Sequence, residues 1–256
     1  MQQLSGYRVL VTGGGSGIGL KIAELFAEVG ARIHICDASP DIVTRCSTEF
    51  PDWICSECDV STDEDVSNLF QKVRDDLGGL DILLNNAGIA GPTGGIDEIS
   101  AKSWLDTVNV NLNGQFYFAK LAVPLLKQSS NPSIVAVSSV AGRLGYAYRS
   151  PYAATKWAIV GIAKSLAIEL GQYGIRVNAL LPGVVEGPRI EKVISARAEA
   201  TRRTYEEMEQ AYINKISLRR MVTAEDLAQQ ALFLCSSQGR NISGQAISVC
   251  GNVEVL

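Results

Sequence analysis

The sequence predicts a doubly wound α/β fold, in which helices cover both faces of a parallel β-sheet. Short β-branched runs alternate with longer segments whose apolar residues recur at helical spacing. No internal repeat, low-complexity tract or linker interrupts the 256 residues. Strands joined through helices make right-handed crossovers and therefore pair in parallel. We expect residues 1–256 to form a single domain that binds ligands beyond the carboxyl ends of its strands.

The first strand and helix show this pattern clearly. Arg8–Val11 is a β-rich run, and Ile18–Val29 places apolar residues at positions 18, 22, 25, 26 and 29 on one helical face. The other expected strands are short apolar runs: Arg32–Cys36, Trp53–Cys55, Ile82–Leu84, Ile134–Val137, Arg176–Leu180 and Ala246–Val249. The other expected helices are Thr62–Leu77, Ser103–Lys127 (with Asn113-Gly114 as the place for a break), Tyr152–Leu170 and Ala224–Leu234.

Residues 188–220 are dense in charge and lie between a strand and the last expected helix. Two interpretations stay open for this segment. It is either a pair of solvated surface helices or a mobile lid over the substrate, because it follows the end of a strand. In both cases it borders the edge of the sheet at which ligands are expected.

The composition is that of a soluble globular protein, with 46 % hydrophobic and 20 % charged residues. A net charge of −4 gives no general attraction to nucleic acids or to acidic membranes. The apolar stretches are too short to span a bilayer, and Met1–Gly6 lacks the basic and apolar segments of a signal peptide. We expect a cytoplasmic protein without nucleic acid or membrane partners.

Cysteine and histidine are not arranged for metal or redox chemistry. Cys55 and Cys58 have the spacing of a redox pair, but they follow a strand instead of opening a helix, and no second pair or nearby histidine completes a metal site. The only histidine, His34, lies on the second expected strand and is expected to be structural. We therefore expect no metal, and this disfavours dehydrogenases that use a histidine base or zinc.

A glycine-rich turn stands between the first strand and the first helix. Its glycines permit a tight turn in which backbone N–H groups approach a pyrophosphate, and the helix dipole favours that anion. The spacing differs from G-x-G-x-x-G, because Ile18 and Leu20 occupy glycine places of that motif. The strand before the turn and the helix after it nevertheless indicate dinucleotide binding. The candidate residues are Gly13, Gly15, Ser16, Gly17, Ile18 and Gly19.

Asp37 ends the second expected strand, about 20 residues after the glycines. A carboxylate there accepts hydrogen bonds from a ribose 2′-hydroxyl and repels a 2′-phosphate. No arginine or lysine lies within the glycine turn or at Ala38-Ser39 to receive such a phosphate. Asp37 therefore favours NAD over NADP, although an aspartate that simply ends a strand in a turn is the alternative interpretation.

Tyr152 and Lys156 open a predicted helix and share one face of it, because four residues make about one turn. A nearby ammonium group favours the phenolate form of a tyrosine and so makes it a usable base. Tyr-x-x-x-Lys is common by chance, but three other features accompany it. Ser138-Ser139 and Asn85–Gly88 end two strands at the same edge of the sheet, and Asn111 interrupts a long helical stretch.

Together with the glycine turn, these motifs resemble the short-chain dehydrogenase/reductase family, from Thr12 to about Val249. The resemblance implies a Rossmann-like fold and an NAD-dependent interconversion of a secondary alcohol and a ketone. Tyr152 would exchange a proton with the substrate oxygen, and Lys156 would favour its phenolate and bind the nicotinamide ribose. Ser139 would hydrogen-bond the substrate oxygen, and Asn111 would hold a water that links Lys156 to solvent.

The resemblance also implies further cofactor contacts. At two places the sequence departs from the family. The contacts are Asp59 and Val60 at the adenine, Asn86, Ala87 and Gly88 at the adenine ribose and the central sheet, and Pro182, Gly183, Val184 and Val185 at the nicotinamide. Gly187 stands where the family often has a threonine, so the backbone or Arg189 would replace that hydroxyl. Cys250-Gly251-Asn252 stands in place of Asp-Gly-Gly, a change expected to affect packing more than chemistry.

The substrate is expected to contact segments 90–95, 143–150 and 183–203. These segments carry several polar side chains, which favour a small polar hydroxy compound such as a polyol, sugar or hydroxy acid, unless the arginines face solvent or another subunit. The side chains are Arg143, Tyr146, Tyr148, Arg149, Glu186 and Arg189. The alternatives are a 3-oxoacyl-thioester reductase, which Asp37 disfavours, and a non-catalytic dinucleotide sensor, which the complete catalytic set disfavours.

The resemblance further implies a homotetramer that pairs the helices at 103–127 and 152–170. The apolar residues of Trp157–Ala167 are consistent with such an interface, but they would also suit an ordinary core.

Overall fold

The computed structural model describes residues 4–255, so Met1–Gln3 of the N-terminal segment discussed above lie outside the described residues. Seven strands form one parallel sheet in the order β3-β2-β1-β4-β5-β6-β7. The strands are β1 (Arg8–Thr12), β2 (Arg32–Asp37), β3 (Ile54–Glu57), β4 (Ile82–Asn85), β5 (Ser133–Val137), β6 (Arg176–Pro182) and β7 (Ala246–Val249). The predicted doubly wound, Rossmann-like architecture is confirmed.

Nine α-helices and five short helical turns connect the strands in the described chain. The α-helices are α1 (Gly17–Glu28), α2 (Pro40–Glu49), α3 (Asp63–Lys72), α4 (Ala101–Val108), α5 (Gly114–Leu126), α6 (Ser150–Leu170), α7 (Pro188–Thr201), α8 (Tyr205–Asn214) and α9 (Ala224–Cys235). The π-helical turns are η1 (Val73–Leu77) and η2 (Asn109–Asn113). The 3₁₀ turns are η3 (Val140–Gly142), η4 (Gly171–Tyr173) and η5 (Ser237–Gly239).

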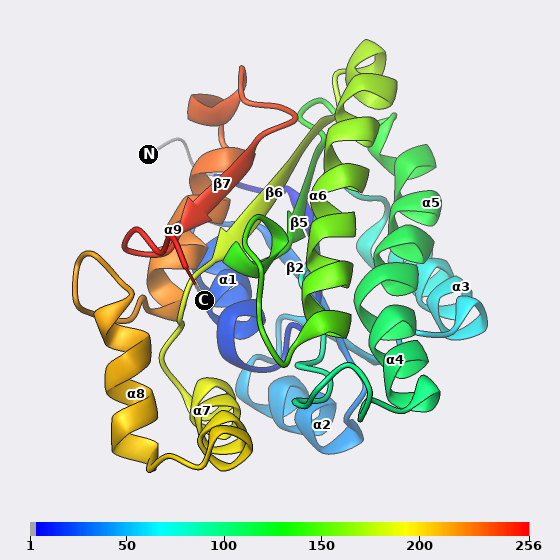
Figure 1. The fold of residues 1–256 in the computed structure, drawn as a ribbon. Coiled ribbons are helices and arrows are strands. Elements are labelled where there is room, and N and C mark those ends of the chain that lie inside the picture. Colours follow the sequence, from blue (N-terminus) through cyan, green and yellow to red (C-terminus); the bar gives the residue numbers. More distant parts are fainter. Residues whose placement is uncertain (1–3, 256) are drawn as a thin grey trace.

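Both faces of the sheet are buried, which explains why its strands read as continuous apolar runs. Val9 and Val11 of β1 pack into the hydrophobic cluster under α1 and α9, whereas Leu10 packs into the cluster under α3, α5 and α6. This alternation follows from the two-residue period of a strand. Figure 1 shows α4, α5 and α6 in front of the sheet and α1 and α9 behind it.

One helix was not predicted, and two predicted features differ in detail. The unpredicted helix is α2, of which only Cys46 is buried, so it contributes few side chains to the core. Its start signals are nevertheless present, since Ser39 caps the helix and Pro40 and Asp41 follow in the first turn. Strand β3 begins one residue later and ends two residues later than the predicted Trp53–Cys55. At the break expected near Asn113-Gly114, the π-helical turn η2 ends at Asn113 and α5 begins at Gly114. Both residues have helical backbone angles, so the helix changes type there without being interrupted.

Segment 188–220 forms the helix pair α7 and α8, which lies beyond the carboxyl ends of β6 and β7 (Figure 1). The pair is not merely solvated. Its buried residues Ile194, Ala198, Met208 and Tyr212 share a third hydrophobic cluster with Val184, which follows β6. The segment is therefore anchored to the sheet edge at which ligands were expected.

None of the helices in residues 4–255 combines the length and the apolar character that crossing a bilayer requires.

Candidate active site

Three segments that are far apart in the sequence meet at the carboxyl edge of the sheet. Gly88 follows β4, Asn111 lies in η2, and Lys156 lies in α6. A Cβ atom on Gly88 would lie 3.1 Å from Asn111 Oδ1 and 3.6 Å from Lys156 Nζ. The structure thus brings together three of the residues that the sequence motifs singled out.

Lys156 is buried at the centre of this arrangement. Its ammonium group donates a hydrogen bond of 2.8 Å to the carbonyl oxygen of Val137, and Ser138 Oγ donates one of 2.7 Å to the carbonyl oxygen of Lys156. Burial, and then the nearby positive charge of Arg189, lower the pKa of Lys156 to about 7. A buried cation without a carboxylate is costly, so this ammonium needs its carbonyl partner.

Tyr152 is half-buried in the first turn of α6, on the same helical face as Lys156. The ammonium nitrogen of Lys156 lies 5.6 Å from the centroid of the Tyr152 ring. Cζ of Arg149 lies 5.0 Å from the same centroid. Two basic side chains therefore lie beside this phenol.

Ser139 is buried where β5 leads into the turn η3. Its hydroxyl oxygen accepts a hydrogen bond of 3.1 Å from the backbone N–H of Ala141. This contact uses a lone pair of the oxygen and leaves the hydroxyl hydrogen free to donate. Ser139 can therefore donate a hydrogen bond to an oxygen in the site.

Asn111 is fully buried, and its side chain fixes the segment that follows β4. Its Oδ1 accepts a hydrogen bond of 2.7 Å from Ile89 N, and its Nδ2 donates to Ile89 O at 3.1 Å and to Thr155 Oγ1 at 3.2 Å. The π-helical turn around Asn111 is a geometry that is frequent at functional sites. Asn111 thus connects η2 both to the loop after β4 and to α6.

The glycine turn forms a cradle that larger residues would fill. Gly13 and Gly17 have φ values of +58° and +52°, which L side chains rarely adopt. A Cβ atom on Gly15 would overlap Ile42, and one on Gly19 would overlap the carbonyl of Gly13. Close backbone approach therefore requires glycine at these positions.

Helix α1 begins at this cradle with its N-terminus uncapped. Ser16 occupies the N-cap position, and its side chain accepts no hydrogen bond from the first turn of α1. By contrast, Ser39, Thr62, Thr204 and Thr223 cap the N-termini of α2, α3, α8 and α9. An uncapped N-terminus facing a glycine cradle fits the phosphates of a dinucleotide, which the free N–H groups and the helix dipole would bind.

Asp37 lies beside the cradle, as the sequence predicts. A Cβ atom on Gly15 would lie 3.4 Å from Asp37 Oδ2, and Asp37 Oδ1 accepts a hydrogen bond of 3.2 Å from Ser39 N. Sequence reasoning missed a third residue here, because it did not predict α2. The guanidinium group of Arg45, on α2, donates a hydrogen bond to the carbonyl of Gly15, so one cation does lie close to the cradle.

Asn86 and Ala87 attach the glycine turn to β4. Asn86 Nδ2 donates hydrogen bonds to Thr12 O at 2.9 Å and to Gly13 O at 3.2 Å, and the N–H of Ala87 donates to Thr12 Oγ1 at 2.8 Å. This pattern holds β1 and β4 at a fixed separation where both strands end.

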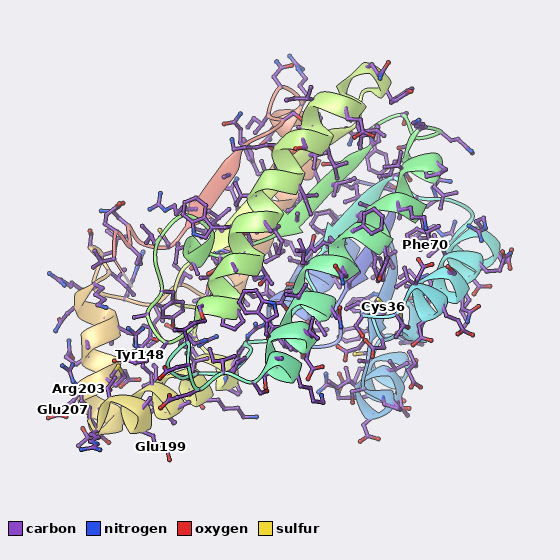
Figure 2. All side chains as sticks on the ribbon, turned by 45° about the vertical axis from the view of Figure 1, so that its right-hand side comes forward. Cys36, Phe70, Tyr148, Glu199, Arg203 and Glu207 are labelled. Carbon is purple, nitrogen blue, oxygen red and sulfur yellow. The ribbon has the colours of Figure 1, made fainter. Side chains whose placement is uncertain are left out.

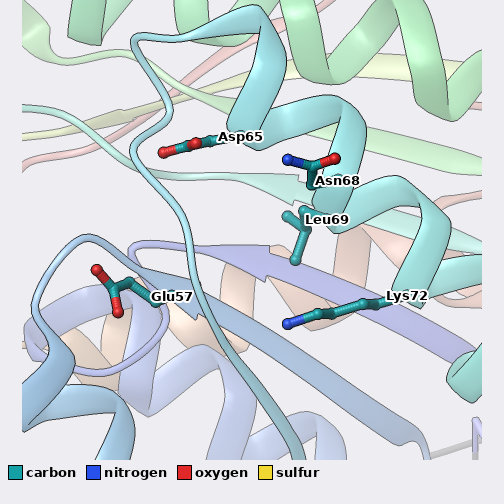
Figure 3. A pocket seen from close by; sticks show the side chains of 5 residues that line it. All are labelled: Glu57, Asp65, Asn68, Leu69 and Lys72. Atoms are coloured by element: carbon teal, nitrogen blue, oxygen red, sulfur yellow. The ribbon is translucent and has the colours of Figure 1, made fainter.

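Asp59 and Val60 follow β3 at one side of the cradle. Asp59 is exposed, whereas Val60 is buried and lies close to Gly114 at the start of α5. The N–H of Asp59 donates a hydrogen bond of 3.2 Å to Asp65 Oδ2. A polar depression adjoins this turn (Figure 3), between the end of β3 and α3, and the motifs gave no sign of it. It is lined by Glu57, Asp65, Asn68, Leu69 and Lys72.

The segment Pro182–Val185 extends from β6 across the site. Gly183 donates from its N–H to Val249 O at 2.9 Å, and a Cβ atom on Gly183 would lie 2.7 Å from Cα of Cys250. The unusual Cys250 thus takes part in tight packing, consistent with the expectation for that departure. Gly187 offers no hydroxyl, and Arg189 Nη1 instead donates a hydrogen bond of 3.0 Å to Gly88 O, which links α7 to the loop after β4.

A cluster of arginines and tyrosines lies next to Tyr152, between the loop before α6 and the helices α7 and α8. Tyr146 OH and Tyr212 OH are 2.6 Å apart, and Arg197 Nη1 donates to Tyr212 OH at 3.2 Å. Burial, and then the neighbouring Tyr212, raise the pKa of Tyr146 well above its usual range, so its hydroxyl stays protonated. Arg197 lies within the expected substrate segment 183–203 but was not singled out, and Tyr212 was not predicted as a site residue. No local motif marks them, because only the folded chain brings α7 and α8 to Tyr146.

Two of the substrate segments expected from the sequence also meet here. The N–H of Gly94 donates a hydrogen bond of 3.0 Å to the carbonyl of Tyr148, whose φ is +63°. Figure 2 shows Tyr148 on the same side of the molecule as Arg203 and Glu207 of the α7–α8 region. An exposed non-glycine residue in this backbone region is strained, and such strain is concentrated at functional sites.

The residues considered above for metal and redox chemistry are the single histidine and the six cysteines. His34 is buried within the sheet, where its Nε2 lies 3.0 Å from Ser56 Oγ, and burial followed by the charge of Lys72 lowers its pKa to about 4. The six cysteines are free thiols. Within residues 4–255, no group of three or more histidine, cysteine, aspartate or glutamate side chains is placed to hold a metal ion.

Comparisons with known proteins agree with this geometry. A family model described as enoyl-(acyl carrier protein) reductase matches residues 13–252. L-fucose dehydrogenase of Bos taurus is 34 % identical over 251 residues, which cover 98 % of this chain and 90 % of that protein. Tropinone reductase-like 1 of Erythroxylum coca is 39 % identical over 266 residues, which cover 100 % of this chain and 93 % of that protein.

A solved structure shares the whole fold. The crystal structure of NAD⁺-bound xylitol dehydrogenase superposes with a TM-score of 0.93 at 25 % identity, covering 98 % of this chain and 100 % of the other. Because the family model and these relatives extend over nearly all of the sequence, the chain belongs to the short-chain dehydrogenase/reductase family and is an oxidoreductase of alcohols and ketones that uses a nicotinamide dinucleotide.

Proposed function

We propose that the protein interconverts a secondary alcohol and a ketone with NAD(H), on a small polar hydroxy compound, and that Tyr152 is its catalytic acid/base. The observation that carries this proposal is the phenol of Tyr152 beside the buried ammonium of Lys156, at the strand edge that also carries the glycine cradle. When bound, the dinucleotide accepts a hydride from the alcohol carbon or returns one to the ketone.

The chain's own residues would handle the proton and the substrate oxygen. In oxidation, the Tyr152 phenolate takes the hydroxyl proton of the alcohol, and in reduction the phenol returns it. Lys156 favours the phenolate through its charge, and Ser139 donates a hydrogen bond to the oxygen on which charge develops. Asn111 would hold a water that connects Lys156 to solvent, a role supported by its burial beside Gly88 and Thr155.

The cofactor would lie across the carboxyl edge of the sheet. Its pyrophosphate would bind at the cradle and at the N-terminus of α1, where the candidate residues are Gly13, Gly15, Ser16, Gly17, Ile18 and Gly19. The adenosine would lie along Asp37, Asp59, Val60, Asn86, Ala87 and Gly88. The nicotinamide would lie against Pro182, Gly183, Val184 and Val185, with Tyr152 and Lys156 at its ribose.

The remaining proposals concern organisation and location. We treat residues 1–256 as a single catalytic domain that works in the cytoplasm, with no metal and with no nucleic acid or membrane partner. Segment 188–220 would cover the substrate, a role supported by the Arg189 hydrogen bond that crosses from α7 to Gly88. Closure of such a lid would slow amide hydrogen exchange in α7 when dinucleotide and substrate are both present.

A 3-oxoacyl-thioester reductase is the alternative function. The description of the matching family model, an acyl-carrier-protein enoyl reductase, favours chemistry on acyl thioesters. The family's acyl-thioester reductases usually favour NADP, however, and the carboxylate of Asp37 beside Gly15 would repel a 2′-phosphate. A non-catalytic sensor is less favoured, because Asn111, Ser139, Tyr152 and Lys156 are all present.

The first test is turnover with purified protein, followed by the absorbance of reduced nicotinamide. Secondary alcohols, polyols, sugars and hydroxy acids are each supplied with NAD or with NADP. We expect turnover with NAD, and we expect Tyr152→Phe to lower kcat by roughly 10²- to 10⁴-fold because the acid/base is removed. Tyr173→Phe, an exposed tyrosine in η4, is the control and should leave kcat unchanged. Binding of NAD without turnover of any substrate would favour the sensor.

The second prediction concerns the cofactor preference. We expect Asp37→Asn to weaken NADH binding about tenfold or more, because hydrogen bonds from the ribose to a charged acceptor are lost. The same change should strengthen NADPH binding, because the repulsive charge is removed while Arg45 remains at Gly15. Fluorescence titrations with both cofactors measure the shift, with the exposed Asp41→Asn on α2 as the control. Unchanged NADH binding in Asp37→Asn would show the assignment of Asp37 to be wrong.

The third prediction concerns the burial of Lys156. Its folded-state pKa of about 7 lies below the value of about 10.4 for an unfolded lysine, so the unfolded state binds more protons between these values. The contribution of Lys156 to the free energy of unfolding should therefore become more favourable as the pH rises from 7 to 10, by up to roughly 1.4 kcal/mol per pH unit.

Urea unfolding of the cofactor-free wild type and of Lys156→Met between pH 6 and 9 measures this effect. The difference isolates the lysine, because the other titrating groups are common to both proteins. We expect Lys156→Met to be relatively most stable at low pH and to lose that advantage above pH 7. A difference that is independent of pH would mean that the ammonium is not desolvated.

The fourth prediction concerns the proposed homotetramer. The exposed apolar side chains Phe116 on α5 and Trp157 and Ile168 on α6 support an interface along these helices. We expect sedimentation of the wild type at four times the mass of one chain, and smaller species for Trp157→Glu because a charge would enter an apolar contact. The control is Phe233→Glu, at an exposed position on α9. A wild type that sediments as a monomer would refute the assembly.

A further inference from the structure

Two arginines beside the catalytic tyrosine are buried without a counter-charge. Arg149 is 2 % exposed and Arg197 is 9 % exposed. Neither takes part in any of the ion pairs formed within residues 4–255. Taking a guanidinium group out of water costs several kcal/mol unless a partner compensates for the lost hydration.

Two other arginines in the sheet are compensated differently. Arg8, whose side chain is 25 % exposed, donates to both carboxylate oxygens of Asp81, at 2.8 and 2.9 Å. Arg176 donates to three backbone carbonyls, those of Leu234, Cys235 and Gly239, at the C-terminal end of α9 and just beyond it. A helix C-terminus carries partial negative charge, so Arg176 is also compensated. Structural arginines in this fold are thus paired.

Arg149 and Arg197 make far fewer hydrogen bonds. Arg149 donates one, at 2.6 Å, to the carbonyl of Ala90, and its buried Nε has no partner within residues 4–255. Arg197 donates one, at 3.2 Å, to the neutral hydroxyl of Tyr212. A guanidinium group has five N–H donors, so most of the hydrogen-bonding capacity of both arginines is unused by the described chain.

Both guanidinium groups lie against the ring of Tyr146, and that of Arg149 also lies against the ring of Tyr152. Cζ of Arg149 lies 5.3 Å, and Cζ of Arg197 5.1 Å, from the centroid of the Tyr146 ring. Arg149 lies equally close, at 5.0 Å, to the ring of Tyr152. Arg149 therefore lies beside the proposed acid/base, and Arg197 lies beside Tyr146, one aromatic ring further away.

Further basic residues lie near Arg197 and near Lys156, although the chain as a whole carries a net charge of −4. Burial, and then the charges of Arg197 and Arg203, lower the pKa of Lys215. Arg189 contributes to the lowered pKa of Lys156 on the other side of the site. Glu186, the acidic residue expected near the pocket, is exposed and pairs with neither buried arginine.

We propose that Arg149 and Arg197 bind an anionic group of the substrate, and that this group is a carboxylate. The substrate is then a secondary hydroxy acid in one direction and the corresponding oxo acid in the other. This inference rests on the proposed function, since it takes Tyr152 as the residue at the reacting carbon. Of the polyols, sugars and hydroxy acids considered above, it selects the hydroxy acids, the one class that carries a charge.

The chemistry of a carboxylate suits the unused donors. Its two oxygens accept paired hydrogen bonds from the planar fork of a guanidinium, and such charge-assisted bonds are about twice as strong as neutral ones. A neutral polyol would leave both charges desolvated and unpaired. The reaction is otherwise that of any secondary alcohol here: the C–H hydride passes to the oxidised dinucleotide, the O–H proton passes to Tyr152, and the carboxylate is unchanged.

The test compares acids with uncharged molecules of the same shape. The substrates are 2-hydroxybutyrate, 3-hydroxybutyrate and 4-hydroxypentanoate, each beside its primary amide, with glycerol 3-phosphate as a phosphate-bearing alcohol. We expect kcat/KM for at least one acid to exceed that of its amide by roughly 30-fold or more, because the amide cannot form the charge-assisted bonds. Preference for the phosphate ester over every acid would overturn the assignment of a carboxylate.

Arg197→Gln is the decisive variant. Glutamine can still donate to Tyr212 but carries no charge, so a purely structural role should be preserved. We expect the variant to lose the preference for the acid over its amide, because kcat/KM for the acid falls toward the value for the amide. Arg240→Met, an exposed arginine directly after η5, is the charge-matched control and should keep the preference. Selectivity that is equal in Arg197→Gln and in the wild type would refute the site.

A measurement without turnover separates this inference from the proposed function. Saturating 3-hydroxybutyrate or acetoacetate should raise the Tm of the wild type and of Arg240→Met but not that of Arg197→Gln. If Tyr152-dependent turnover is found only with neutral substrates and no acid raises the Tm, the anion site is wrong while the proposed function stands.

Discussion

The ammonium group of Lys156 is buried at the carboxyl end of β5, and the arrangement of the site depends on holding it there. Its hydrogen bond to Val137 O attaches α6 to the last residue of β5, and the hydrogen bond from Ser138 to Lys156 O repeats that attachment one residue later. Gly88 and Asn111 approach this group so closely that a side chain on Gly88 would have little room. The ring of Tyr152 lies one helical turn away, with its centroid 5.6 Å from this nitrogen.

The cofactor half of the site is governed by a different constraint, the close approach of backbone to backbone. The side chain of Asn86 and the N–H of Ala87 hold the end of β4 against the end of β1, while the glycines of the turn leave space beside it. The N-terminus of α1 then opens toward that space without a capping side chain. A bound anion would satisfy these N–H groups, just as serine and threonine satisfy them in α2, α3, α8 and α9.

The half of the site that we propose to bind substrate carries two buried guanidinium groups that form no ion pair within residues 4–255. By contrast, the buried Arg176 donates to several backbone carbonyls, and the partly exposed Arg8 is paired with Asp81. Arg149 retains unused donors next to Tyr152, and Arg197 retains them next to Tyr146. Leaving charge uncompensated reduces stability, and such a cost is commonly found where a protein binds or transforms a ligand.

Much of this protein follows from sequence alone, because its signals are local. Short continuous apolar runs set the strands, the glycines between β1 and α1 set the cradle, and a spacing of four residues puts Tyr152 and Lys156 on one helical face. Other features depend on segments that meet only after folding. Helix α2, of which only Cys46 is buried, delivers Arg45 to Gly15, and α7 and α8 deliver Arg197 and Tyr212 to Tyr146. Such contacts join residues 30 to 66 positions apart, and no periodicity within one element encodes them. The sequence by itself therefore determined the fold class and the spacing of Tyr152 and Lys156, whereas only the packing of α7 and α8 against the sheet edge decided which arginine and tyrosine lie beside Tyr146.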